Sequence, residues 1–231
     1  MKFFLLLIVL TSTPFFAQDN SEIKNLYKTF DSIVGIKNTD LSYGKTYTEK
    51  YRFLEDSHPY FVKNEFTKGT VTYQNQTFYD VYVKYNLVED ELIVNLPSDF
   101  ENRSFVLEKL LLENFSLQNS LFINDTEYGL LELLFTSENI SLYKKNTKSK
   151  RKQLNKTFLY YKFIDEHFYL LKKDTIMYPI KTKRDFSKLF PNQKKEISAF
   201  YKSNKTLKES NLDEFYKLLT TKIQNNIINK K

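Results

Sequence analysis

The segment TVTYQNQTFYDVYVKYNLVEDELIVNL, residues 70 to 96, alternates apolar side chains with mostly polar ones. Only an extended chain can use a period of two, because its successive side chains point to opposite faces of a sheet. One face receives Tyr79, Val81, Val83, Tyr85 and Leu87, and the polar stretches QNQ and VEDE interrupt the alternation. The pattern predicts three antiparallel strands joined by hairpins.

Later segments predict a second set of strands. Residues 128 to 135, 140 to 145 and the stretch KTFLYYKFIDEHFYLLKKDTIMYPI are rich in aromatic, leucine and β-branched residues,. In that stretch, IDEH predicts a break between strands and Lys172 to Asp174 a turn, so that another meander results. The segment from Phe105 to Phe115 fits a strand or, by its leucine spacing, a helix.

The chain has a helical period near both ends. Apolar residues between Ile23 and Val34 recur at helical spacing and stop before Gly35,. From Lys183 onward, RDFSKLF predicts a short helix and Pro191 can start the next one. The last helix has an apolar stripe from Leu212 to Ile227 and follows Ser210-x-x-Asp213, which fits a capping box.

These patterns predict an α+β protein, predominantly an antiparallel β-sheet of hairpins and meanders with an N-terminal helix and a C-terminal helical segment. We divide it into a signal peptide (1–17), an N-terminal helix with a β-rich body (18–183) and C-terminal helices packed on that body (184–231). Lys2, the apolar run from Phe3 to Leu10 and Ala17 are typical of a secretory signal,. The expected location is therefore outside the cytoplasm, in the periplasm or at the cell surface, and no segment is expected to span a membrane.

Charge is distributed unevenly along the chain. Residues 18 to 141 hold 11 basic and 20 acidic residues, whereas residues 142 to 231 hold 23 basic and 8 acidic ones. The two halves can pair internally, or the basic half can face an acidic partner. The densest run, KKNTKSKRK, lies between two predicted strands and is therefore predicted to be a hairpin loop. Its candidate binding residues are Lys144, Lys145, Lys148, Lys150, Arg151 and Lys152.

An anionic partner for this run would be an acidic envelope protein, a polysaccharide or lipid headgroups; the alternative is a solvated loop without a ligand. Nucleic acid is not expected, because no nucleic-acid-binding module accompanies the charge and the predicted signal leads out of the cytoplasm. The tyrosines of the predicted strands, such as Tyr73 and Tyr160, can stack on sugars or bases, although core packing is the favoured interpretation.

Motifs for catalysis or metal binding are weak. Asp165-Glu166-His167 offers acid-base groups, but we expect it at a hairpin tip in water. Glu89-Asp90-Glu91 is likewise expected to be a solvated tip, since it lacks the spacing of a calcium loop. The chain has no cysteine, no nucleophile elbow and only 4 scattered glycines,. We therefore predict no catalytic residue, cofactor or metal ligand.

Several segments resemble a group of secreted proteins of unknown function from Bacteroidota bacteria. They are FYDVYVKYNLVEDELIV, GLLELLFTSENISLYKK and, most specifically, the strand followed by RDFSKLFPNQKKEI. The resemblance implies a protein of a Gram-negative envelope and carries over no site residue. The leading hypothesis is a non-enzymatic binding or accessory module. The alternatives are an envelope hydrolase using Asp165, Glu166 and His167, and a structural subunit of an envelope complex.

Overall fold

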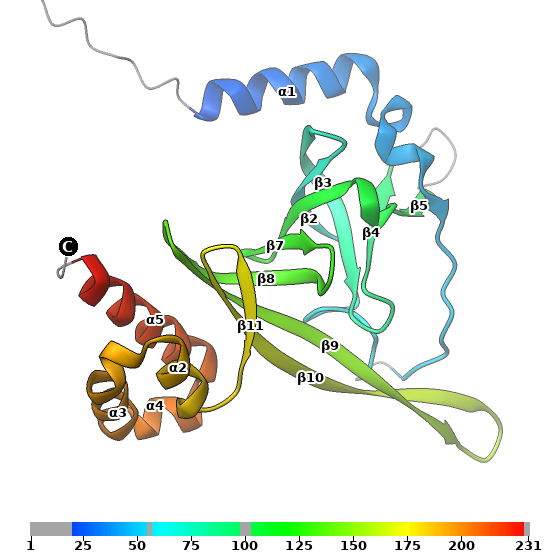
Figure 1. Ribbon diagram of the computed structural model, residues 1–231. Coiled ribbons are helices and arrows are strands. Elements are labelled where there is room, and N and C mark those ends of the chain that lie inside the picture. The colour runs from blue at the N-terminus through cyan, green and yellow to red at the C-terminus, as the bar shows by residue number, and fades with distance from the viewer. Residues whose placement is uncertain (1–19, 55–56, 98–102, 229–231) are drawn as a thin grey trace, which may run out of the picture.

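The computed structural model describes residues 20–54, 57–97 and 103–228, and within them the strands form one 11-stranded antiparallel sheet. Its strand order is β1-β5-β4-β3-β2-β6-β7-β8-β9-β10-β11, so most neighbours in space are also neighbours in sequence. Helix α1 lies at one end of the molecule and helices α2 to α5 gather beside the far strands (Figure 1). The predicted α+β class is confirmed; the predicted signal peptide, residues 1–17, lies outside the described residues.

The bounds of the elements are as follows. The strands are β1 (Lys45–Thr46), β2 (Thr67–Tyr73), β3 (Gln76–Asn86), β4 (Glu91–Leu96), β5 (Arg103–Val106), β6 (Leu112–Leu117), β7 (Ser120–Asp125), β8 (Gly129–Thr136), β9 (Ile140–Leu154), β10 (Leu159–Lys173) and β11 (Ile176–Ile180). The helices are α1 (Asn20–Val34), α2 (Lys183–Leu189), α3 (Lys194–Ser203), α4 (Lys205–Ser210) and α5 (Leu212–Ile228), with 3₁₀ turns η1 (Ile36–Asn38), η2 (Asp40–Tyr43), η3 (Lys109–Leu111) and η4 (Pro191–Gln193).

The three strands predicted from the alternating segment are β2, β3 and β4. Gln74 and Asn75 both have positive φ and form a two-residue turn between β2 and β3, the geometry that suits a tight hairpin,. Asp80 also has a positive φ of 56°, and β3 has one residue more than β2 at this point, which is a β-bulge,. The bulge changes the phase of the alternation, so Phe78 rather than Tyr79 joins Val81 in the core.

The largest departure from prediction is the hairpin of β9 and β10. Residues 144 to 152, predicted to be a loop, are strand throughout, and Lys148 lies opposite Asp165 in unbroken register. The triplet from Asp165 to His167, predicted at a tip, therefore lies in mid-strand. The actual turn follows Asn155, whose Oδ1 accepts a hydrogen bond from the Thr157 N–H,. Cross-strand pairing outweighs the low β-propensity of these charged residues.

The segment from Phe105 to Phe115, which fitted either a strand or a helix, contains the end of β5, the short turn η3 and the start of β6.

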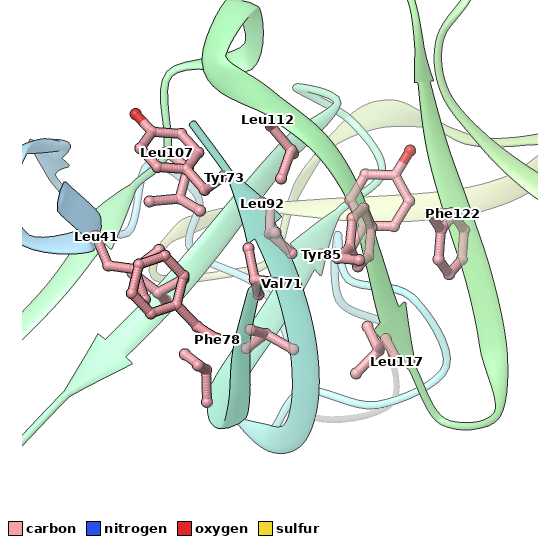
Figure 2. Packing of buried hydrophobic residues seen from close by; sticks show 14 of the residues in the cluster. Leu41, Val71, Tyr73, Phe78, Tyr85, Leu92, Leu107, Leu112, Leu117 and Phe122 are labelled. Carbon is pink, nitrogen blue, oxygen red and sulfur yellow. The ribbon is translucent and has the colours of Figure 1, made fainter. Parts of the chain in front are cut away.

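One core lies against the curved part of the sheet that runs from β4 through β3, β2, β6 and β7 to β8. Figure 2 shows Tyr85, Phe122, Val71 and Leu92 pointing toward one another from separate strands. Phe115 and Phe122 stack with their ring centroids 4.7 Å apart, and both are fully buried.

A second core lies between β9 to β11 and the C-terminal helices. Leu142 and Leu171 of the sheet belong to it together with Phe186 of α2 and Phe215 of α5. The last helix begins at Leu212, and the Oδ1 atom of Asn211 accepts the Glu214 N–H at 3.0 Å. Asn211 is therefore the N-cap in place of the predicted Ser210.

Helix α1 forms as predicted but buries little of its apolar stripe. Its contacts to the body are with β3, where Tyr27 meets Tyr79 and Lys28 pairs with Asp80 at 2.6 Å. Leu26 is 71% exposed and Ile33 is 80% exposed. No helix in the described part of the chain combines the length and the apolar character that crossing a bilayer requires,.

We expect Phe122→Ala to lower the free energy of unfolding by about 3–5 kcal/mol, because it removes one ring of the buried stack and leaves a cavity. Urea unfolding followed by circular dichroism measures this. The matched control is Leu121→Ala, one residue earlier and 39% exposed, which should cost less than about 1 kcal/mol. Equal losses in the two variants would contradict the assignment of Phe122 to the core.

Candidate functional site

The six basic residues predicted as a binding site lie on β9, and its alternation divides them between two faces. Lys144, Lys148, Lys150 and Lys152 share one face, and Lys145 and Arg151 share the other,. A loop would have let all six converge on one ligand. The strand instead places each in a different environment.

Lys145 is buried, with 6% of its surface exposed. Its Nζ lies 2.7 Å from Asp90 Oδ1, and Lys109 Nζ lies 2.7 Å from Asp90 Oδ2. The hydroxyl of the fully buried Tyr85 donates to Asp90 Oδ1 at 2.6 Å. Lys145 is therefore part of an internal ion-pair network and not of an exposed site. The prediction that Asp90 is a solvated tip is also wrong, because the β3–β4 turn folds against β8 and β9.

Gly129 makes room for this network. A Cβ at this position would lie 2.1 Å from Asp90 Oδ2, and the residue has a φ of +72°. Both the close approach of the carboxylate and the left-handed backbone require glycine here.

Burial and pairing act against each other on the pKa values of the network. For Asp90, burial is the largest single influence and raises the pKa, but Lys145, Lys109 and Tyr85 together outweigh it and hold the pKa below its usual 3.8. For Lys145, burial lowers the pKa and Asp90 offsets this only in part. The folded structure thus favours the charged form of Asp90. The charged form of Lys145 is disfavoured by burial and is stabilised by Asp90.

Asp90→Asn should cost about 3–5 kcal/mol of folding free energy, because it leaves the Lys145 ammonium buried without a counterion. Asparagine tolerates the positive φ of Asp90, so backbone strain is not added. Asp90→Asn with Lys145→Met should recover most of the loss, which chemical denaturation of the three proteins measures. A double variant as unstable as Asp90→Asn alone would contradict the dependence of Lys145 on Asp90.

The same network predicts a pH dependence. Because the folded pKa of Asp90 is depressed, its contribution to stability is complete above the unfolded pKa, about 3.9, and is lost as pH falls through the lower folded pKa. Between pH 6 and pH 3, the wild-type protein should therefore lose more unfolding free energy than Asp90→Asn/Lys145→Met. An equal loss in both proteins would contradict the network.

Three further lysines of the run also have partners within the chain. Lys144 lies 2.7 Å from Asp213 of α5. Lys148 donates to the His58 carbonyl at 3.0 Å and lies 3.3 Å from Asp165. Lys150 donates to the Tyr51 hydroxyl at 2.6 Å and lies 3.6 Å from Glu89. Lys145 and Lys150 thus join the basic half of the chain to carboxylates of the acidic half.

Arg151 and Lys152 are exposed, and neither forms an ion pair within residues 20–54, 57–97 and 103–228. Arg151 lies directly opposite Lys162 of β10, and Lys156 follows in the turn. We call Arg151, Lys152, Lys156 and Lys162 the distal basic patch; it extends around the outer end of the hairpin, with Lys152 on the face opposite to Arg151 and Lys162,. It keeps two of the six predicted residues and adds two that the sequence reasoning missed, because only the register reveals Lys162 as the neighbour of Arg151.

The acid-base triplet of β10 does not converge on one point. Asp165 and His167 lie on one face of the strand, and Glu166 lies on the other,. The side chain of Asp165 is 80% exposed, and Glu166 accepts a hydrogen bond from Ser149 at 2.6 Å. No group of three or more possible metal ligands comes together in the part of the chain that the structure describes.

Several strand tyrosines belong to the cores, which was the favoured interpretation: Tyr73, Tyr85 and Tyr169 are buried.

The sequence reasoning missed a crossing segment, residues 47–54 and 57–60, that lies along the hairpin. Its Tyr51 ring packs edge-on against Tyr161 and Phe163 of β10. Aromatic residues of this segment lie two positions apart in the sequence. That spacing is typical of an extended chain and was the signal for it.

Comparisons with protein-family models, with curated protein sequences and with solved structures found no match to this chain.

Proposed function

We propose that this chain is an exported cell-envelope binding module whose distal basic patch contacts an anionic partner. The observation that carries the proposal is the pair of Arg151 and Lys162. Like charges directly opposite each other on antiparallel strands are destabilising, and these two have no acidic partner among the described residues. An anion placed between them would remove their repulsion and take up their hydrogen-bond donors.

The position of the patch supports the proposal. β8 pairs with β9 only up to Lys144, and β11 pairs with β10 only from Tyr169 onward. The outer part of the hairpin therefore extends beyond the rest of the sheet, as Figure 1 shows. A basic surface that projects in this way can reach a polyanion without a clash with the body of the protein.

The envelope location rests on the signal-like N-terminus and on the resemblance to secreted Bacteroidota proteins. Anionic groups of an envelope include acidic proteins, polysaccharides and lipid headgroups, and they share the chemistry that the patch can recognise. The proposal includes no nucleic acid.

The alternatives have less support. A hydrolase using the whole β10 triplet would need its three groups to converge on one point, whereas Glu166 lies on the face opposite to Asp165 and His167,. The structural-subunit alternative draws on α1, whose exposed apolar stripe could pack against another envelope protein,.

The test replaces Arg151 and Lys162 by serine. At low salt, binding to dextran sulfate, polyglutamate or phosphatidylglycerol vesicles should weaken about thirtyfold, since each of the two basic residues near an anionic surface contributes about 1 kcal/mol. The difference should shrink as salt is raised to about 1 M, where the Debye length is short. Comparison of the three probes identifies the class of anion.

The matched control is Lys194→Ser/Lys195→Ser on α3, where both lysines are exposed. It removes the same net charge far from the hairpin and should leave binding nearly unchanged. If both double variants weaken binding equally, the overall charge of the protein and not the patch is responsible, and the proposal is wrong.

A further inference from the structure

The outer part of β9 has an open edge. Its pairing with β8 ends at Lys144, and the Lys148 N–H donates to the Leu87 carbonyl at 3.3 Å. Because this N–H points away from β10, the alternation of the strand makes the backbone groups of Lys150 and Lys152 point outward as well. The register with β10 runs unbroken from Ile140 to Leu154. No hydrogen bond within the described residues satisfies the outward N–H groups of Lys150 and Lys152.

The opposite edge of the hairpin is occupied. The Tyr161 N–H of β10 donates to the Arg52 carbonyl at 2.8 Å, and the Phe163 N–H donates to Ser57 Oγ at 2.9 Å. Phe53 forms a parallel bridge with Tyr161. The crossing segment thus already adds an extended chain to β10. The hairpin therefore already pairs with an extended segment along β10, and along the outer part of β9 its backbone N–H and C=O groups are open to the same kind of pairing.

We propose that an extended acidic segment of a partner protein adds as a further strand to β9 between Lys150 and Leu154. This inference rests on the proposed function and names its partner class. Backbone hydrogen bonds to Lys150 and Lys152 would supply the pairing, in the manner of strand addition. Residues of the added strand opposite Arg151 and Lys152 would be Asp or Glu, since opposite charges are favourable at such positions.

The charges of this edge also decide against the simplest competing occupant. A second copy of the chain would bring an identical row of basic residues against this one, and like charges on an edge are a common protection against such pairing. An acidic strand meets no repulsion.

The experiment separates the backbone contribution from the charge. Lys152→Ser removes the charge and keeps the N–H, whereas Lys152→Pro removes both. The probe is a synthetic peptide of eight Glu residues, and its binding at low salt is measured by fluorescence anisotropy. We expect Lys152→Ser to weaken binding a few-fold, and Lys152→Pro to weaken it about five- to tenfold more, the equivalent of one lost hydrogen bond.

Dextran sulfate is the matched control ligand, because it carries negative charge without peptide groups. It should bind Lys152→Pro and Lys152→Ser equally. Circular dichroism shows whether the proline disturbs the hairpin. A second measurement does not depend on the protein variant: N-methylation of every residue, which removes the N–H donors from both edges of the peptide, should abolish its binding to the wild-type protein.

Strand addition is overturned if Lys152→Pro and Lys152→Ser bind the peptide equally and the N-methylated peptide binds as well as the plain one. In that event, a loss of peptide binding in Arg151→Ser/Lys162→Ser would still uphold recognition by charge. If that double variant also binds normally, the proposed function fails together with the inference.

Discussion

The arrangement of the sheet depends on the contacts of one carboxylate, that of Asp90. It lies in the turn after β3 and holds Lys145 of β9 and Lys109 of η3 at the same time, with the hydroxyl of Tyr85 as a third donor. These partners come from parts of the chain that the sheet order separates. The network therefore joins the β3–β4 turn to β9 and to η3.

Burying this network has a cost that its geometry offsets. An ammonium as buried as that of Lys145 is tolerated only when a counterion and further acceptors satisfy it, and the Leu130 carbonyl at 3.2 Å adds one such acceptor. Gly129 has no side chain and so lets the carboxylate approach β8 closely. The network thus specifies one arrangement of turn, strand and glycine, and slipped registers of β9 would leave its charges unpaired.

The sequence predicted those features that depend on local periodicity. A period of two residues predicted the strands around Val81 and Val83, and a period of 3.6 residues predicted the helices at both ends. All of these elements are present. The periodicity missed what depends on pairing with other segments of the chain. Residues 144 to 152 form a strand because β10 pairs with them, and nothing within KKNTKSKRK signals this. For the same reason Arg151 could be predicted as a binding residue, whereas its neighbour Lys162 could not, and the burial of Lys145 follows from Asp90, which is 55 residues away.

The crossing segment has a consequence for the order of folding. Most strands of the sheet pair with the next strand in sequence, so each pairing closes a short loop at small entropic cost. The contacts of the crossing segment with the hairpin span much longer loops: Ser57 and Phe163 are 106 residues apart, and Tyr51 and Lys150 are 99 apart. The meander can therefore assemble stepwise from its hairpins, and the crossing segment completes the structure once both halves of the sheet are in place.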